Sequence, residues 1–103
     1  MEGAAMFLAK VIGNVVSTQK NARFQGMKLM LIQPYITRDG KLVESGSSVV
    51  AVDSVGAGEG ELVMFTQGSS ARLTDSTKDC PVDAVIIGIV DTVELAGRRL
   101  EKP

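Results

Sequence analysis

A loop with glycine at alternate positions, set between two apolar runs, is the feature that most constrains this chain. Residues 49–52 form a β-branched run typical of a strand, and residues 62–66 form a second one. Gly56, Gly58 and Gly60 lie between them. Glycine permits positive φ and carries no Cβ, so another chain segment can approach such a loop closely. The stretch therefore predicts a strand, a contact loop and a second strand.

The same glycines do not match a phosphate-binding loop. A dinucleotide fingerprint needs Gly-x-Gly-x-x-Gly at the start of a helix, whereas Glu61 and a predicted strand follow here. A phosphate loop ends in Gly-Lys-Ser/Thr, and no lysine lies between Lys41 and Lys78. The sequence therefore favours a tight turn packed against a neighbour over a nucleotide site.

Residue types that usually carry catalysis are scarce. The chain has no histidine, the commonest general base and metal ligand, and Cys80 is its only cysteine, which excludes an internal disulfide. The serines after Gly68 have no base to activate them and are explained as helix caps. We predict no catalytic residue, no metal site and no cofactor. An enzyme would need carboxylates acting alone, for instance Asp53 with Glu59 or Glu61.

The charge balance argues against nucleic acid or a membrane as the partner. Lys and Arg number 11 and Asp and Glu 12, so the formal net charge is -1 and no basic footprint exists. A single-stranded nucleic-acid-binding module is the alternative function, but it needs stacking aromatics, and aromatics make up only 4%. No apolar stretch approaches the length of a membrane span, and a single cysteine fits a reducing cytoplasm.

Three further strands are expected, at residues 7–16, 28–33 and 82–93. Pro34 is expected to end the second one because proline cannot donate to a strand ladder. The sequence Arg38-Asp39-Gly40-Lys41 signals a hairpin turn, and residues 44–48 continue as a loop. A single helical turn is expected at residues 68–72.

These elements predict an all-β fold, a small closed OB-like β-barrel of about five strands with one short helical turn. The barrel domain spans residues 6–93. Residues 1–5 form an N-terminal extension, and residues 94–103 form a charged C-terminal tail that is weakly structured unless a neighbour holds it.

Several of the expected strands are apolar on both faces, although a barrel has only one inside. In residues 7–16, one face is expected to carry Phe7, Ala9, Val11, Gly13 and Val15, and the other Leu8, Lys10, Ile12, Asn14 and Val16. Burial of one Val, Leu or Ile side chain contributes roughly 1.5 to 3 kcal/mol. We infer that identical subunits cover the outer apolar set by packing side by side in a closed ring.

Five sequence blocks follow one another from about Met6 to Val93. They are Lys10-Val11-Ile12-Gly13 with Val15-Val16-Ser17-Thr18; Lys28-Leu29 with Gln33-Pro34; residues 51–63 around the glycine-rich loop; Gly68-Ser69-Ser70-Ala71-Arg72; and Pro81-Val82-Asp83-Ala84 with Gly88-Ile89-Val90-Asp91. Together, and in this order, they resemble the EutN/CcmL family of bacterial microcompartment vertex proteins.

The resemblance implies a structural protein that forms homopentamers at the vertices of a carboxysome or metabolosome shell. Its expected partners are the hexameric and trimeric shell proteins that tile the facets. Sheets of hexamers are flat, so five-fold units are needed at the corners. Such a protein acts by its geometry and needs no catalytic group.

By the same resemblance, the loop Gly56-Ala57-Gly58-Glu59-Gly60-Glu61 is expected to form the oligomer interface, near the five-fold axis. Asp53 and Glu61 either cap loop amides, pair with Arg72 or stay solvated. Arg72 is the candidate for a salt bridge between subunits, with Asp53 as its partner, because arginine can make paired bonds to a carboxylate.

Overall fold

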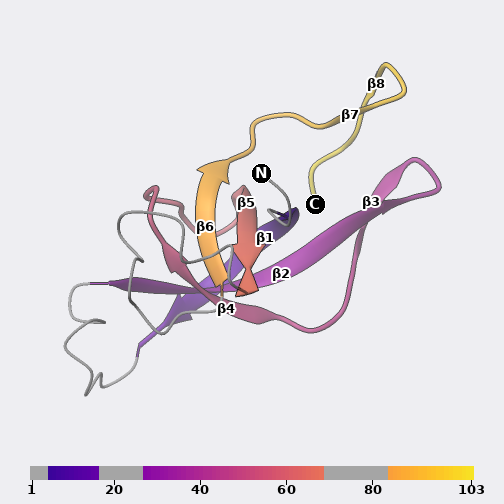
Figure 1. Cartoon of the computed structure of the whole chain (residues 1–103). Helices are drawn as coiled ribbons and strands as arrows, with labels where there is room; N and C mark the ends of the chain where they lie inside the picture. The colour runs from indigo at the N-terminus through magenta and orange to yellow at the C-terminus, as the bar shows by residue number, and fades with distance from the viewer. Residues whose placement is uncertain (1–4, 17–26, 69–83) are drawn as a thin grey trace.

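The structure, a computed structural model, describes residues 5–16, 27–68 and 84–103 (Figure 1). Over these residues the regular elements are all strands: β1 (Met6–Val15), β2 (Lys28–Arg38), β3 (Lys41–Glu44), β4 (Val49–Asp53), β5 (Leu62–Gln67), β6 (Ala84–Ile89), β7 (Glu94–Leu95) and β8 (Arg98–Arg99). No helix in these ranges is long and apolar enough to cross a membrane. The helical turn expected at residues 68–72 falls outside the described residues, except for Gly68.

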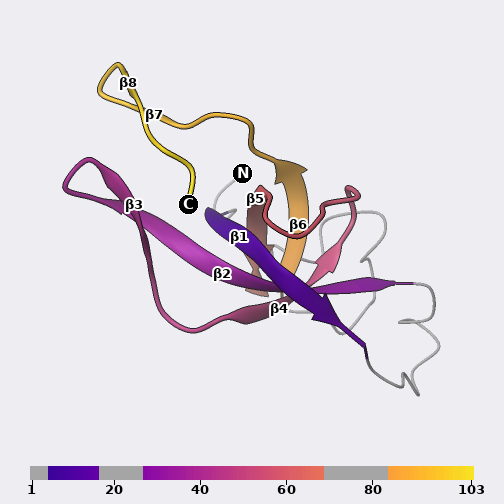
Figure 2. The ribbon, with the colours of Figure 1, turned by 180° about the vertical axis from the view of Figure 1, so that it is seen from behind.

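Five strands close into a barrel, as the sequence predicts. The strand order is β1-β5-β6-β4-β2, and β2 pairs again with β1 to complete the circle. The ribbon seen from both sides shows this closed arrangement (Figures 1 and 2). All neighbours are antiparallel except β4 and β6, which are parallel through Val52↔Val85 and Asp53↔Ile86. The order and the single parallel contact are those of an OB-like barrel.

The inside of the barrel is filled by small and aliphatic side chains around one phenylalanine. The fully buried set is Ala9, Val11, Met30, Ile32, Ala51, Ala57, Val63, Phe65, Ala84 and Ile86. Phe65 is the largest of them, and its ring centroid lies 5.5 Å from that of the half-exposed Phe7. A second buried cluster contains Val52 and Val85, with Met27, Leu29 and Ile87 packed against it. Because Val52 and Val85 alternate with core residues, this cluster lies on the outer face of the sheet.

The simple alternation predicted for residues 7–16 breaks at a β-bulge. Val11 pairs with Ile32, but Gly13 pairs with Leu31, so Ile12 is an extra residue in β1. A one-residue insertion shifts the following side chains to the opposite face. The expectation that Gly13 and Val15 share the inner face with Val11 is therefore wrong.

Pro34 does not end β2, contrary to expectation. The strand continues to Arg38 and pairs with β3 through Tyr35↔Glu44 to Arg38↔Lys41. On this side of β2 the partner changes from β4, which pairs up to Ile32, to β3. The Pro34 carbonyl accepts a hydrogen bond of 2.9 Å from the Ser45 amide, so this side of Pro34 faces the change of partner strand. The nitrogen of Pro34, which has no hydrogen to donate, faces the same side. The proline therefore lies at the end of the β2–β3 ladder and does not interrupt its interior.

The hairpin turn predicted at residues 38–41 is confirmed. Asp39 has φ 53 and Gly40 has φ 75, and Arg38 pairs with Lys41 across them. Two consecutive residues with positive φ connect two strands in the sense of their natural twist. The hairpin carries β2 and β3 beyond the barrel wall (Figure 1).

The last barrel strand is shorter than predicted, and the tail is more regular. β6 ends at Ile89. The next residue, Val90, donates one more hydrogen bond from its amide to the Leu62 carbonyl of β5, at 2.8 Å. The chain then leaves the barrel and forms the β7–β8 hairpin around Ala96 and Gly97, which both have positive φ. Residues 94–103 thus contain a projecting hairpin, here called the C-terminal arm (Figures 1 and 2).

The outer wall of the barrel has an apolar region, as the sequence predicts. Val50 on β4 pairs with Leu31 on β2, which pairs with Gly13 beside Ile12 on β1. Ile12 is 46% exposed and Val50 is 49% exposed. These side chains lie at one level of three adjacent strands, so they form a continuous apolar strip.

We predict that Phe65→Ala destabilises the barrel by about 3 to 5 kcal/mol, because truncating a fully buried aromatic ring leaves a cavity. Denaturant unfolding followed by circular dichroism measures the loss. Phe7→Ala is the matched control, since its ring is 43% exposed and its removal should cost clearly less. Equal losses for the two variants would contradict a core centred on Phe65.

Candidate functional site

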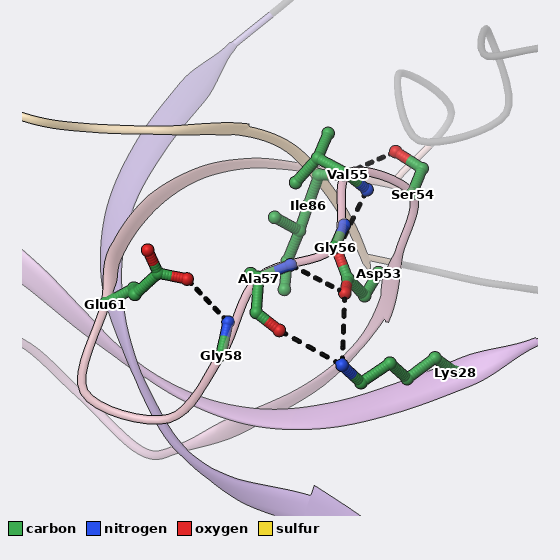
Figure 3. A network of polar contacts seen from close by, with 9 residues as sticks. All are labelled: Lys28, Asp53, Ser54, Val55, Gly56, Ala57, Gly58, Glu61 and Ile86. Carbon is green, nitrogen blue, oxygen red and sulfur yellow. Dashed lines mark hydrogen bonds and ion pairs between the residues drawn. The ribbon is translucent and has the colours of Figure 1, made fainter.

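The glycine-rich loop, residues 54–61, joins β4 to β5 as the sequence predicts and is held by side chains at both of its ends (Figure 3). Its last residues extend the pairing of β5 with β1. The Gly60 amide donates to the Val11 carbonyl at 2.8 Å, and the Val11 amide donates to the Glu61 carbonyl at 2.9 Å. The loop is therefore docked at the bulge in β1.

Asp53 caps the start of the loop. Its Oδ1 accepts bonds from the amides of Val55 (3.0 Å) and Gly56 (3.1 Å), and its Oδ2 accepts one from Ala57 (2.9 Å). The Asp53 side chain is only 1% exposed, so these three bonds replace the water that a buried carboxylate loses. The sequence left capping of loop amides as one of three roles for Asp53, and the structure confirms it.

Lys28 supplies the positive charge beside this carboxylate. Its Nζ lies 3.8 Å from Asp53 Oδ2 and donates to the Ala57 carbonyl at 3.1 Å. The ammonium group thus bridges the first residue of β2 to both the aspartate and the loop backbone. The Lys28 side chain is 52% exposed, so the ion pair itself adds little, and the backbone bond fixes its geometry.

Glu61 performs a similar function at the other end. Its Oε1 accepts a bond of 2.6 Å from the Gly58 amide, and its own amide donates to the Gly58 carbonyl at 3.2 Å. A carboxylate bonded to a backbone amide stabilises a tight turn. The expectation that Glu61 caps a loop amide is confirmed, whereas the Glu59 side chain is exposed.

The three glycines have different roles. Gly56 has φ 80 and Gly60 has φ 88, so their backbones lie in the region that favours glycine. Gly58 does not have positive φ, and a Cβ placed there would lie 3.5 Å from Glu61 Oε1, an ordinary contact. The conformation of the protomer therefore explains Gly56 and Gly60 but leaves the absence of a side chain at Gly58 unexplained.

Two further contacts of the loop were not anticipated from the sequence. Ala57, between the glycines, is fully buried and belongs to the core cluster. Ser54 Oγ donates to the Ile86 carbonyl at 2.7 Å, which ties the loop to β6. In the sequence, Ala57 is an apolar residue between two glycines. This was the only feature that could have indicated its burial in the core.

The arrangement is structural in its chemistry. Asp53 and Glu61, two carboxylates of the hypothetical enzyme, are both bonded to loop amides. Within residues 5–16, 27–68 and 84–103, no group of three or more potential metal ligands is gathered together.

The pKa of Tyr35, on the outer wall, is raised by burial and further by the Glu44 carboxylate, so the hydroxyl stays neutral at ordinary pH.

Arg72 lies outside the described residues. The predicted salt bridge between Asp53 and Arg72 of neighbouring subunits therefore remains a prediction.

Comparison with known proteins identifies relatives along nearly the whole chain. The family model described as "Ethanolamine utilisation protein EutN/carboxysome" matches residues 6–91. The bacterial microcompartment shell vertex protein GrpN of Rhodospirillum rubrum is 48% identical over 89 residues, which cover 86% of this chain and 97% of that protein. The carboxysome shell vertex protein CcmL of Synechocystis is 44% identical over 95 residues, which cover 92% of each.

Solved structures agree with the fold. The structure described as the GrpN pentameric microcompartment shell protein from Rhodospirillum rubrum superimposes with a TM-score of 0.75 at 48% identity. The match covers 87% of this chain and 99% of that one.

We predict that Asp53→Ala destabilises the protein by about 3 kcal/mol or more, because three loop amides then lose their buried acceptor. Chemical denaturation gives the free energy, and hydrogen exchange of the Val55, Gly56 and Ala57 amides locates the effect. The control is Glu59→Ala, an exposed carboxylate in the same loop, which should change stability by no more than about 0.5 kcal/mol. Unchanged protection of the three amides in Asp53→Ala would refute the capping role.

Proposed function

Because the chain belongs to the EutN/CcmL family, whose model matches residues 6–91, we propose that it is a vertex protein of a bacterial microcompartment shell. It forms a homopentamer that caps a corner of the polyhedral shell in the cytoplasm. The observation that supports this best is the relation to GrpN, which is 48% identical and is described as pentameric. The barrel domain and the glycine-rich loop both lie within the matched range.

The outer wall of the barrel fits assembly into a ring. The apolar strip of Ile12, Leu31 and Val50 is partly exposed in the single protomer. Apolar surface of this kind is stabilised by removal from water, at about 25 cal/mol for each Å² buried. A closed ring provides that burial for every copy without leaving a free end.

The proposed role is structural and not enzymatic. Six-fold tiles assemble into flat layers, and a polyhedron needs five-fold units where its facets meet. A rigid barrel that assembles into a five-fold ring meets this need by its geometry. Of the carboxylates considered for catalysis, Asp53 and Glu61 accept hydrogen bonds from loop amides and so stabilise the loop.

Hexameric and trimeric shell proteins are the proposed partners at the rim of the pentamer. Residues 56–61 of the glycine-rich loop are the proposed site where subunits converge, which gives a reason for glycine at position 58. Arg72 is the proposed partner of Asp53 across that contact. Residues 1–5 and the C-terminal arm lie outside the proposed barrel domain.

We predict that Gly58→Val disrupts the ring more than the fold. The protomer has room for a Cβ at this position, but two extra methyl groups would occupy the space into which a neighbour packs. Native mass spectrometry should give species smaller than the parent ring, while circular dichroism stays unchanged. An intact ring in this variant would show that the loop does not contact a neighbouring subunit.

Gly60→Ala is the contrasting variant. Its φ of 88 makes any side chain strained, although nothing lies within 4 Å of a Cβ placed there. It should therefore lower the unfolding midpoint of the protomer. A comparison of the two variants separates assembly from folding.

We also predict that shells made without this protein are elongated or leaky and are not absent, because flat tiling does not require vertices. Co-expression of the hexameric shell proteins of the same gene cluster, with and without this chain, followed by electron microscopy tests it. Closed polyhedra of normal shape in both preparations would rule out the vertex role.

A further inference from the structure

The C-terminal arm and the β2–β3 hairpin project from the same side of the barrel and enclose a cleft of about 580 Å³. Both views show the two hairpins beside one another (Figures 1 and 2). Lys41 and Leu42 line the cleft from the first hairpin, and Leu95, Arg98 and Arg99 line it from the arm. The arm strands pair only with each other and not with a barrel strand among the described residues.

The cleft carries an excess of positive charge. Its lining includes four cationic side chains, Lys41, Arg98, Arg99 and Lys102, against one carboxylate side chain, Glu101. The Lys28–Asp53 pair is the only ion pair between described residues, so these four cations have no such partner there. Leu95, beside them, is 41% exposed. The cationic side chains of the lining thus outnumber its one carboxylate side chain, and Leu95 stays partly exposed.

A matching surface lies away from the cleft on the same molecule. Lys28, the first residue of β2, touches the glycine-rich loop, whereas Arg38, the last, lies at the tip of the first hairpin. β2 has 11 residues. At about 3.3 Å per residue its ends are roughly 33 Å apart. The loop exposes Glu59 and Glu61, which lie beside Gly13 and Val11. The β2 partners of those two residues are Leu31 and Ile32, roughly 20 Å from Arg38 at about 3.3 Å per residue.

We propose that the cleft receives the glycine-rich loop of the next protomer in the ring, with Glu59 and Glu61 facing the arm cations. This proposal rests on the proposed pentamer and names its contact. A ring requires two unlike surfaces that fit each other on each copy, because its contacts run head to tail. A basic cleft and a separate acidic loop meet this condition. A second copy also supplies apolar surface for Leu95, which a small anion would not.

The test compares single charge reversals in the full chain. Arg99→Glu should raise the ring's dissociation constant at least tenfold, as measured by mass photometry over a dilution series. Arg99→Lys, which keeps the positive charge at the same position, is the matched control and should leave the constant nearly unchanged. Glu59→Arg should weaken the ring as Arg99→Glu does, and the combined variant should regain part of the lost affinity.

A cross-link gives a second measurement that does not depend on affinity. In a Cys80→Ser background, Glu59→Cys with Arg99→Cys and a short bis-maleimide should link chains into ladders up to the full ring. The separation within one chain is too great for an internal link, so monomer-only products would overturn the proposal. An intact ring that is indifferent to all charge reversals would overturn it as well and leave the pentamer standing. Absence of any ring in the parent chain would instead refute the proposed function.

Discussion

A barrel of five short strands has a single interior, and that limit on volume determines much of this structure. Ten residues, most of them alanine, valine or isoleucine, fill it around Phe65. Apart from residues that pack at the edge of this core, such as Val49 and Phe7, the other apolar residues of the barrel strands face outward. Part of the outer set is buried in the cluster of Val52 and Val85, and part remains exposed as the strip of Ile12, Leu31 and Val50. The protomer is therefore a unit with apolar surface left for a neighbour.

The glycine-rich loop shows how a contact surface is kept rigid without a helix or a strand. Asp53 and Glu61 bind four loop amides between them, Ala57 is fixed in the core, and Gly60 is bonded to β1. The loop backbone is thus determined inside the protomer. A loop already ordered in the free subunit loses little conformational entropy when it binds, which favours a stable ring.

The projecting hairpins give the molecule its length, with extents of 45 × 31 × 22 Å. They put a basic cleft beside the Arg38 end of β2, and the acidic loop lies roughly 20 Å away, beside Val11 and Gly13. A net charge of -1 conceals this separation, because the sum counts the 11 basic and 12 acidic residues of the chain without regard to their positions. The same composition therefore excludes a basic footprint for nucleic acid and still allows electrostatic complementarity between copies.

The sequence by itself determined the five barrel strands, the Asp39-Gly40 turn and the outward apolar surplus, because alternation, β-branching and turn residues are local properties. It also limited the roles of Asp53 and Glu61 to a few, including the caps that they form. Only the tertiary structure decided that Pro34 lies within a strand, since its missing donor falls where β2 changes partner. The bulge at Ile12, the burial of Ala57 and the position of the arm beside the first hairpin likewise depend on which segments, distant in sequence, lie next to each other. The periodicity of one segment does not indicate which other segment it pairs with.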